Sequence, residues 1–223
     1  MRAHLVLDFD STIVTVESLD ELAAMALEGR PDRGEVLARI KAITDAGMDG
    51  SLPIDRSLAQ RLALLSFDRG LVDRLVDRLH ATISPSLLVH AAELRAAADR
   101  VWVVTSGFHE WIDPVVAALG IPSSQVRANR LRWSADGRCE GIDPDSALAT
   151  PRSKPRAVRA LGLQGPVIAV GDGITDWEIR SDGAADLFIA LTETVARAPV
   201  VARADVVAAD FHAVFDRWTA GHR

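Results

Sequence analysis

The stretch HLVLDFDSTIVTVESLDEL, residues 4–22, joins an apolar run to two acidic residues. Leu5, Val6 and Leu7 have the branched, apolar character of a buried strand. Asp8 and Asp10 follow directly, and two carboxylates so close to a buried strand lose hydration and repel each other. The stretch therefore predicts a strand that ends in a charged site, where another group must stabilise the acidic pair.

Two further apolar runs end in small or polar residues in the same way. They are VWVVTSG (101–107) and PVIAVGDG (166–173), and helical patterns such as EWIDPVVAALG and KPRAVRALGL lie between them. Because strands and helices alternate, we expect an α/β fold with a Rossmann-like parallel sheet covered by helices on both faces. DLFIAL (186–191) and DVVAAD (205–210) are expected to add strands.

Residues 16–81 interrupt this alternation. They contain about four helical patterns and no run typical of a strand, and the capping-box signature Ser18-x-x-Glu21 opens the first pattern. We therefore expect a helical-bundle cap at 16–81, inserted after the first strand, and a core made of residues 1–15 and 82–223.

A second irregular segment lies between the second and third apolar runs. Residues 125–143 alternate around an Asp136-Gly137 turn signal. This pattern predicts a β-hairpin placed on the edge of the sheet.

Composition limits the partners and the compartment. The chain has 223 residues, 48% of them hydrophobic, and a formal net charge of −6, so neither nucleic acid nor an anionic membrane is an expected partner. Cys139 is the only cysteine, which fits a reducing, cytoplasmic setting. Asp8 and Asp10 interrupt any signal peptide, and no apolar run approaches the roughly 18 residues of a membrane span. The oligomeric state stays open.

The polar residues that follow the three runs are expected to meet at one edge of the sheet. In an open α/β sheet, ligands bind beyond the carboxyl ends of the strands. The residues there are Asp8, Asp10, Thr105, Ser106, Asp172 and Asp176. Four converging carboxylates suit a hard divalent cation, and Mg²⁺ accepts few carboxylates while favouring phosphate as a further ligand.

The remaining polar groups suit phosphoryl transfer, which needs a metal, a cationic side chain and fixed hydrogen-bond donors around the moving group. Lys154, at the start of an expected helix, supplies the cation. The Thr105 hydroxyl and the backbone N–H groups of Ser106 and Gly107 supply donors. A carboxylate can attack phosphorus and form an aspartyl phosphate.

Four motifs in order resemble those of the haloacid dehalogenase superfamily: DFDST, the threonine of VVTSGF, Lys154 and GDGITD. Within that superfamily the chain is most similar to the phosphoserine phosphatases. This likeness runs through DFDSTIVTVESLDELA, AGMDGSLPIDRSLAQRLALL, ANRLRW and GDGITDWE, so it spans most of the chain, including the helical cap.

The resemblance assigns roles to the residues of the sheet edge. It implies that Asp8 is the nucleophile and that Asp10 is the general acid and base, which protonates the leaving alkoxide and then activates water. Mg²⁺ would be bound by Asp8, the backbone carbonyl of Asp10 and Asp172, with Asp176 supporting its waters. The phosphoryl oxygens would be bound by Thr105, Ser106, Gly107 and Lys154.

The expected cap supplies residues that can recognise the substrate. Arg61 lies along the apolar stripe of PIDRSLAQRLALL, where a guanidinium needs an anion. The resemblance implies that Arg61 binds the substrate carboxylate, which suits its bidentate geometry, that Glu17 binds the amino group, and that Met48 lies nearby. Two alternatives stay open: Arg61 pairs with a carboxylate of the cap, or Glu17 serves only a helix N-terminus. Ser106 replaces a glycine that is usual in the family, which adds bulk beside the substrate.

The leading hypothesis is a Mg²⁺-dependent phosphatase for a small phosphomonoester, which acts through an aspartyl phosphate. The favoured substrate is O-phospho-L-serine, in serine biosynthesis. Alternatives are a phosphotransferase to a small alcohol such as homoserine, and a phosphatase for another metabolite phosphate. A receiver domain is about half this length, and Asp10 together with GDGITD disfavours a metal-free dehalogenase.

Overall fold

Six parallel strands form the central sheet of the computed structural model, which describes residues 2–220. The strand order is β3-β2-β1-β6-β7-β8, so β1 and β6 lie side by side in the middle. The strands are β1 (His4–Leu7), β2 (Val101–Phe108), β3 (Val126–Asn129), β6 (Val167–Gly171), β7 (Leu187–Leu191) and β8 (Val206–Ala208). The α/β fold with a parallel sheet is thereby confirmed.

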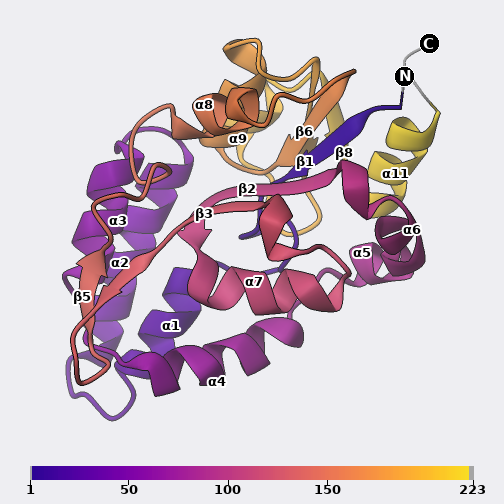
Figure 1. Ribbon diagram of the computed structural model, residues 1–223. Coiled ribbons are helices and arrows are strands. Elements are labelled where there is room, and N and C mark those ends of the chain that lie inside the picture. Colours follow the sequence, from indigo (N-terminus) through magenta and orange to yellow (C-terminus); the bar gives the residue numbers. More distant parts are fainter. Residues whose placement is uncertain (1, 221–223) are drawn as a thin grey trace.

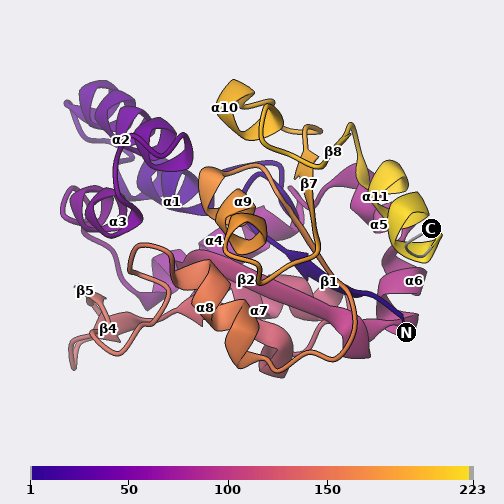
Figure 2. The same ribbon diagram turned by 90° about the horizontal axis from the view of Figure 1, so that it is seen from above.

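Helices cover both faces of this sheet because successive strand residues point to opposite sides. Leu5 and Leu7 belong to one apolar cluster and Val6 to another. The first cluster includes residues of α5 (Pro85–Val89), α6 (Ala91–Ala96), α7 (His109–Ala118) and α11 (Phe211–Thr219). The second includes residues of α8 (Ser153–Ala160), α9 (Ile174–Ser181) and α10 (Ala198–Val201). Figure 1 shows α8 above β2 and α7 below it, and in Figure 2, seen from above, α8 and α9 lie in front of the sheet.

The segment expected to form the cap contains four helices and no extended strand, and the structure describes all of it. The helices are α1 (Ser18–Ala26), α2 (Arg33–Met48), α3 (Ile54–Leu62) and α4 (Arg69–His80). They gather at the side of the molecule away from the two termini (Figure 1). Leu75 and Leu79 of α4 are fully buried in the same apolar cluster as Trp111 of α7. We propose the division into a cap at 16–81 and a core at 1–15 and 82–223, with α4 as the helix that joins the two.

The start of α1 differs from the capping-box prediction, which is wrong. Glu17 is the N-cap residue and its side chain makes no capping hydrogen bond. The backbone N–H of Ser18 donates to Asp10 Oδ1 at 2.8 Å, while Ser18 Oγ accepts from Trp111 Nε1 at 2.9 Å. Asp10 therefore binds the N-terminus of α1, where a carboxylate is favoured, and the serine hydroxyl is left to bind α7.

The hairpin prediction is half right. Gly137 has a φ of +81°, as its turn requires, and β4 (Leu131–Trp133) pairs with β5 (Cys139–Ile142). However, residues 126–129 form a parallel strand of the main sheet, and the hairpin is a separate two-stranded sheet. The hairpin reaches the cap, where the Cys139 N–H donates to the Phe67 carbonyl at 3.0 Å. Period-two alternation is the same in both kinds of strand, so the pattern could not separate them.

Candidate active site

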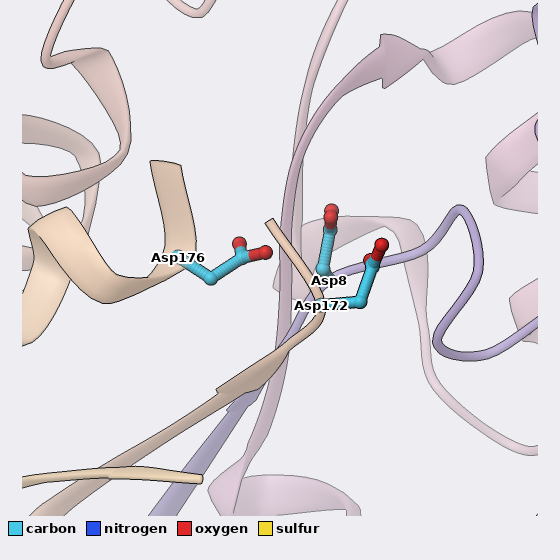
Figure 3. A group of neighbouring side chains, drawn as sticks. All are labelled: Asp8, Asp172 and Asp176. Carbon is cyan, nitrogen blue, oxygen red and sulfur yellow. The ribbon is translucent and has the colours of Figure 1, made fainter. Parts of the chain in front are cut away.

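The carboxyl ends of the two central strands place three aspartates together. Asp8 follows β1, Asp172 follows β6, and Asp176 lies in the first turn of α9. Each offers a carboxylate oxygen that lies within 4.8 Å of the other two. Asp8 and Asp172 stand side by side, and Asp176 extends toward them from its helix (Figure 3). All three are buried, with at most 4% of the residue exposed.

Lys154 neutralises part of this charge. Its Nζ donates to Asp176 Oδ1 at 2.6 Å and forms an ion pair, rather than a well-directed hydrogen bond, with Asp8 Oδ1 at 2.8 Å. Burial alone would lower the pKa of Lys154, but Asp176 and Asp8 raise it above its usual value, so the side chain stays charged. Gly171 permits this packing, because a Cβ there would lie 2.2 Å from Asp176 Oδ2.

Asp10 has the properties of a general acid. Burial, followed by the charges of Glu17 and Asp8, raises the pKa of Asp10 to about 8, although hydrogen bonds from Ser18 oppose the shift. The side chain is therefore mostly protonated at neutral pH and can donate a proton. Ser11 follows in the left-handed conformation, with a φ of +52°, where the chain turns away from β1.

The residues at the strand ends fit a divalent cation. Asp172 Oδ1 is buried, and no donor of the described chain reaches it. Burial, and then the charges of Glu17, Asp176 and Asp8, raise the pKa of Asp172 well above its usual range, which is the sign of a site with too much negative charge. A hard cation with oxygen ligands would remove both problems, and Mg²⁺ matches carboxylate donors.

The end of β2 provides the groups expected to bind phosphate. Thr105 is 1% exposed, and its Oγ1 accepts from the Gly107 N–H at 3.1 Å. Asn129 of β3 donates to the Ser106 carbonyl at 2.8 Å and fixes the strand end. Ser106 Oγ is enclosed without a partner among the described residues. Thr105, Ser106 and Gly107 line one pocket together with Asp8 and Lys154.

The cap contributes residues to the lining of that pocket. Its lining includes Glu17, Met48 and Arg61, the three residues expected to bind the substrate. Glu17 Oε1 accepts from Ser11 Oγ at 2.8 Å, and burial raises the pKa of Glu17. Arg61 is only 6% exposed although it carries a charge. The predicted residues therefore line this pocket, apart from Asp172 and Asp176, which lie beside Asp8, and their individual roles stay predictions.

Arg197 is a site residue that the sequence reasoning missed. It follows β7, and its Nε donates to Asp172 Oδ2 at 2.9 Å. Its Nη2 lies 3.5 Å from Glu17 Oε1, and its Nη1 lies 3.8 Å from Asp45 Oδ1 of α2. Arg197 thus connects the sheet edge with the cap. The rule that ligands bind beyond strand ends, applied to DLFIAL as well, would have directed attention to this loop.

Comparisons with known proteins agree with this geometry. The model of the haloacid dehalogenase-like hydrolase family matches residues 5–179. Phosphoserine phosphatase of Mus musculus is 31% identical over 92% of this chain and 88% of that protein. The chloroplastic phosphoserine phosphatase of Arabidopsis thaliana is 32% identical over 89% of this chain, which spans 65% of the plant protein.

Solved structures show the same relationship. A phosphoserine phosphohydrolase-like protein from Francisella tularensis superposes with a TM-score of 0.87 at 27% identity, over 97% of this chain and 99% of that one. A phosphoserine phosphatase solved as a phospho-aspartyl intermediate analogue superposes with a TM-score of 0.78 at 26% identity, over 97% and 99%. The chain belongs to the haloacid dehalogenase-like hydrolases. Within that family it is a phosphoric monoester hydrolase that resembles phosphoserine phosphatases. Among the described helices, none is long and apolar enough to cross a membrane.

Proposed function

We propose that the protein hydrolyses O-phospho-L-serine to L-serine and phosphate. The observation that carries this proposal is that Arg61 and Glu17 line the same pocket as Asp8 and Lys154. A cation and an anion that line the same pocket as Asp8 match the carboxylate and the ammonium of an amino-acid phosphate. The similarity to the phosphoserine phosphatases of mouse and Arabidopsis thaliana favours the same substrate. A cytoplasmic role in serine biosynthesis is part of the proposal.

The reaction proceeds in two displacements at phosphorus. Asp8 attacks phosphorus while the bond to the serine oxygen breaks, and Asp10 gives its proton to that oxygen, so serine leaves and an aspartyl phosphate forms. Asp10, now a carboxylate, then takes a proton from water as the water oxygen attacks phosphorus. The bond to Asp8 breaks, phosphate leaves, and both aspartates return to their starting states.

Other groups balance the charge of the phosphoryl group. Lys154, Thr105, Ser106 and Gly107 line the same pocket as Asp8, and we expect them to bind the phosphoryl oxygens. The Gly107 N–H, which donates to Thr105 Oγ1 in this structure, would have to exchange that partner for phosphate. Asp8, Asp172 and the backbone carbonyl of Asp10 would bind Mg²⁺, and Asp176 would hold its waters. When bound, the ion supplies positive charge that offsets the carboxylates and the phosphate dianion.

A panel of phosphomonoesters tests the proposal. Phosphate release should show the highest kcat/KM for O-phospho-L-serine, with phosphoethanolamine and glycerol phosphate lower by roughly ten- to a hundredfold, because each lacks a charge-assisted contact. Added homoserine should not divert the phosphoryl group, and its phosphorylation would identify a phosphotransferase. A preference for phosphates without an amino-acid head group would contradict the proposed substrate.

A further inference from the structure

Arg61 does not stand free on the cap wall, since two side chains hold one end of its guanidinium. Its Nη1 donates to Thr44 Oγ1 at 3.1 Å and lies 3.7 Å from Asp20 Oδ1. The Thr44 hydroxyl in turn donates to Asp20 Oδ1 at 2.7 Å. Thr44 is 2% exposed, so its hydroxyl uses its proton on Asp20 and accepts from Arg61 in a space without bulk water.

The Nε donor, on the opposite edge of the same guanidinium, has no partner among the described residues. Arg61 Nε is buried, and no acceptor of the described chain reaches it, although Arg61 lines the pocket. A guanidinium is a rigid planar fork, so fixing Nη1 also fixes the direction of the edge formed by Nε and Nη2. That edge has the spacing of a bidentate carboxylate contact. A buried donor without a partner is costly, which indicates that this edge awaits a ligand.

The packing of α2 on α3 sets the distance between Thr44 and Arg61. The two helices approach so closely at Gly47 that a Cβ there would lie 2.7 Å from Ser57 Oγ. Ser57 Oγ also donates to the Ile43 carbonyl of α2 at 3.3 Å. Thr44 lies one turn before Gly47, and Arg61 lies one turn after Ser57. The close contact therefore presents the threonine hydroxyl to the arginine.

We propose that Thr44, oriented by Asp20, is a positioning residue that aims the free edge of Arg61 at the carboxylate of the substrate. The inference rests on the proposed function, in which Arg61 binds that carboxylate. Without the hydroxyl, the guanidinium keeps its charge but loses its fixed direction. Recognition of the amino-acid head group then weakens, while the chemistry at Asp8 is unchanged.

The test compares Thr44→Val, which removes the hydroxyl at nearly constant shape, with Thr44→Ser, which retains it. For Thr44→Val we expect kcat/KM for O-phospho-L-serine to fall about tenfold, mainly through KM, because one hydrogen bond to a charged group is lost. Hydrolysis of p-nitrophenyl phosphate, which has no carboxylate, should stay within about twofold. Thr44→Ser should resemble the wild type. Thr219→Val on α11 applies the same change far from the pocket and should alter neither substrate.

A double-mutant cycle separates positioning from a general effect on the cap. In an Arg61→Ala background, Thr44→Val should cause no further loss on phosphoserine, because the residue acts through the missing guanidinium. Thermal unfolding of each variant checks the fold, and Thr44→Ala replaces Thr44→Val if the valine variant does not fold. Equal losses on both substrates, or a full loss that adds to that of Arg61→Ala, would overturn the proposal. If the wild type prefers phosphoserine and Thr44→Val keeps that preference, only the positioning role fails; if the wild type shows no preference, the proposed function fails with it.

Discussion

The two walls of the pocket are built on different principles. On the core wall, Lys154 meets Asp8 and Asp176 at 2.8 and 2.6 Å, and each of these side chains is at most 5% exposed. On the cap wall, Arg61 and Glu17 are held through the hydroxyls of Thr44 and Ser11, and Arg61 keeps an unpaired Nε. The core wall pairs one lysine with several carboxylates and keeps an excess of negative charge, whereas the cap wall keeps a guanidinium with one donor unpaired among the described residues.

We infer from this difference that the core wall carries out phosphoryl transfer and that the cap wall selects the substrate. Phosphoryl transfer needs charges that are in place before the reaction, and strand ends of one sheet provide such fixed positions. Recognition of the amino-acid head group of a substrate needs charged groups whose hydrogen-bonding capacity is not already used within the protein. Helices of an inserted segment can present such groups. The core wall should therefore govern all substrates alike, and the cap wall should distinguish between them.

The largest expected effect comes from Asp8, the proposed nucleophile on the core wall. Asp8→Asn should lower kcat by roughly 10³-fold or more on every substrate, because an amide cannot form the aspartyl phosphate. Asp145→Asn, on an exposed residue, is the matched control and should leave activity unchanged. Circular dichroism should show that the fold of the Asp8→Asn protein survives. Activity above a few per cent of wild type would reject Asp8 as nucleophile.

Metal removal should have the second-largest effect, and it should lower the activity on both substrates equally. We expect EDTA to abolish hydrolysis of phosphoserine and of p-nitrophenyl phosphate, and added Mg²⁺ to restore both. The reason is that the aspartates of the core wall would repel a phosphate dianion without the cation. Ca²⁺ should substitute poorly, since its looser coordination misplaces the ligands. Full activity after thorough chelation would remove the metal from the mechanism.

The pH dependence of stability tests the excess charge of the core wall. Folding raises the pKa of Asp10 from 3.8 to about 8 and that of Asp176 to about 7, in both cases mainly through burial. Between these values and the unfolded one, the folded protein binds more protons, so the free energy of unfolding falls as the pH rises. The metal-free Tm should drop by about 5 °C or more from pH 5 to pH 8.5.

Mg²⁺ provides the control for that measurement. Because the cation takes over the role of the protons, it should raise the Tm more at pH 8 than at pH 5.5. Differential scanning fluorimetry at several pH values measures both effects. A metal-free Tm that is constant or rises across this window would show that the carboxylates are not destabilised by burial.

Ser106→Ala should have the smallest effect. The hydroxyl is enclosed without a partner, so its removal should leave the free energy of unfolding unchanged or raise it slightly. Since Ser106 belongs to the core wall, kcat/KM for phosphoserine and for p-nitrophenyl phosphate should move by the same factor, less than about tenfold. A selective change on phosphoserine would instead place the Ser106 hydroxyl among the groups that read the head group.

The acidic part of the core wall could be predicted from sequence because Asp8 and Asp172 stand next to recognisable strands. Asp8 and Asp172 follow apolar runs directly, and parallel strands bring their carboxyl ends to one edge regardless of loop details. Lys154 was proposed as the cation from its place at the start of an expected helix, and the ordered set of motifs supported that choice. Its contacts with Asp8 and Asp176 depend on where α8 packs, which no local pattern specifies.

The cap wall was predictable only in part. Arg61 could be identified from the sequence as a charged residue on an apolar helix stripe. Thr44 and Asp20 could not be identified, because their contacts depend on the packing of α1, α2 and α3. Arg197 was missed for a similar reason, because it reaches Asp172 from a loop that lacks a motif. The capping box failed because Asp10 competes with Ser18 for the same N-terminus, a tertiary contact that overrides a local signature.

The separation of the two walls is tested most directly by Arg61→Ala assayed on two substrates. We predict that kcat/KM for O-phospho-L-serine falls by ten- to a hundredfold, roughly the value of a charge-assisted contact, while that for p-nitrophenyl phosphate stays within about twofold. Arg156→Ala, on an exposed residue, serves as the control for loss of a guanidinium. Equal losses on the two substrates would show that Arg61 supports the cap rather than the substrate, and would contradict the assignment of substrate choice to the cap wall.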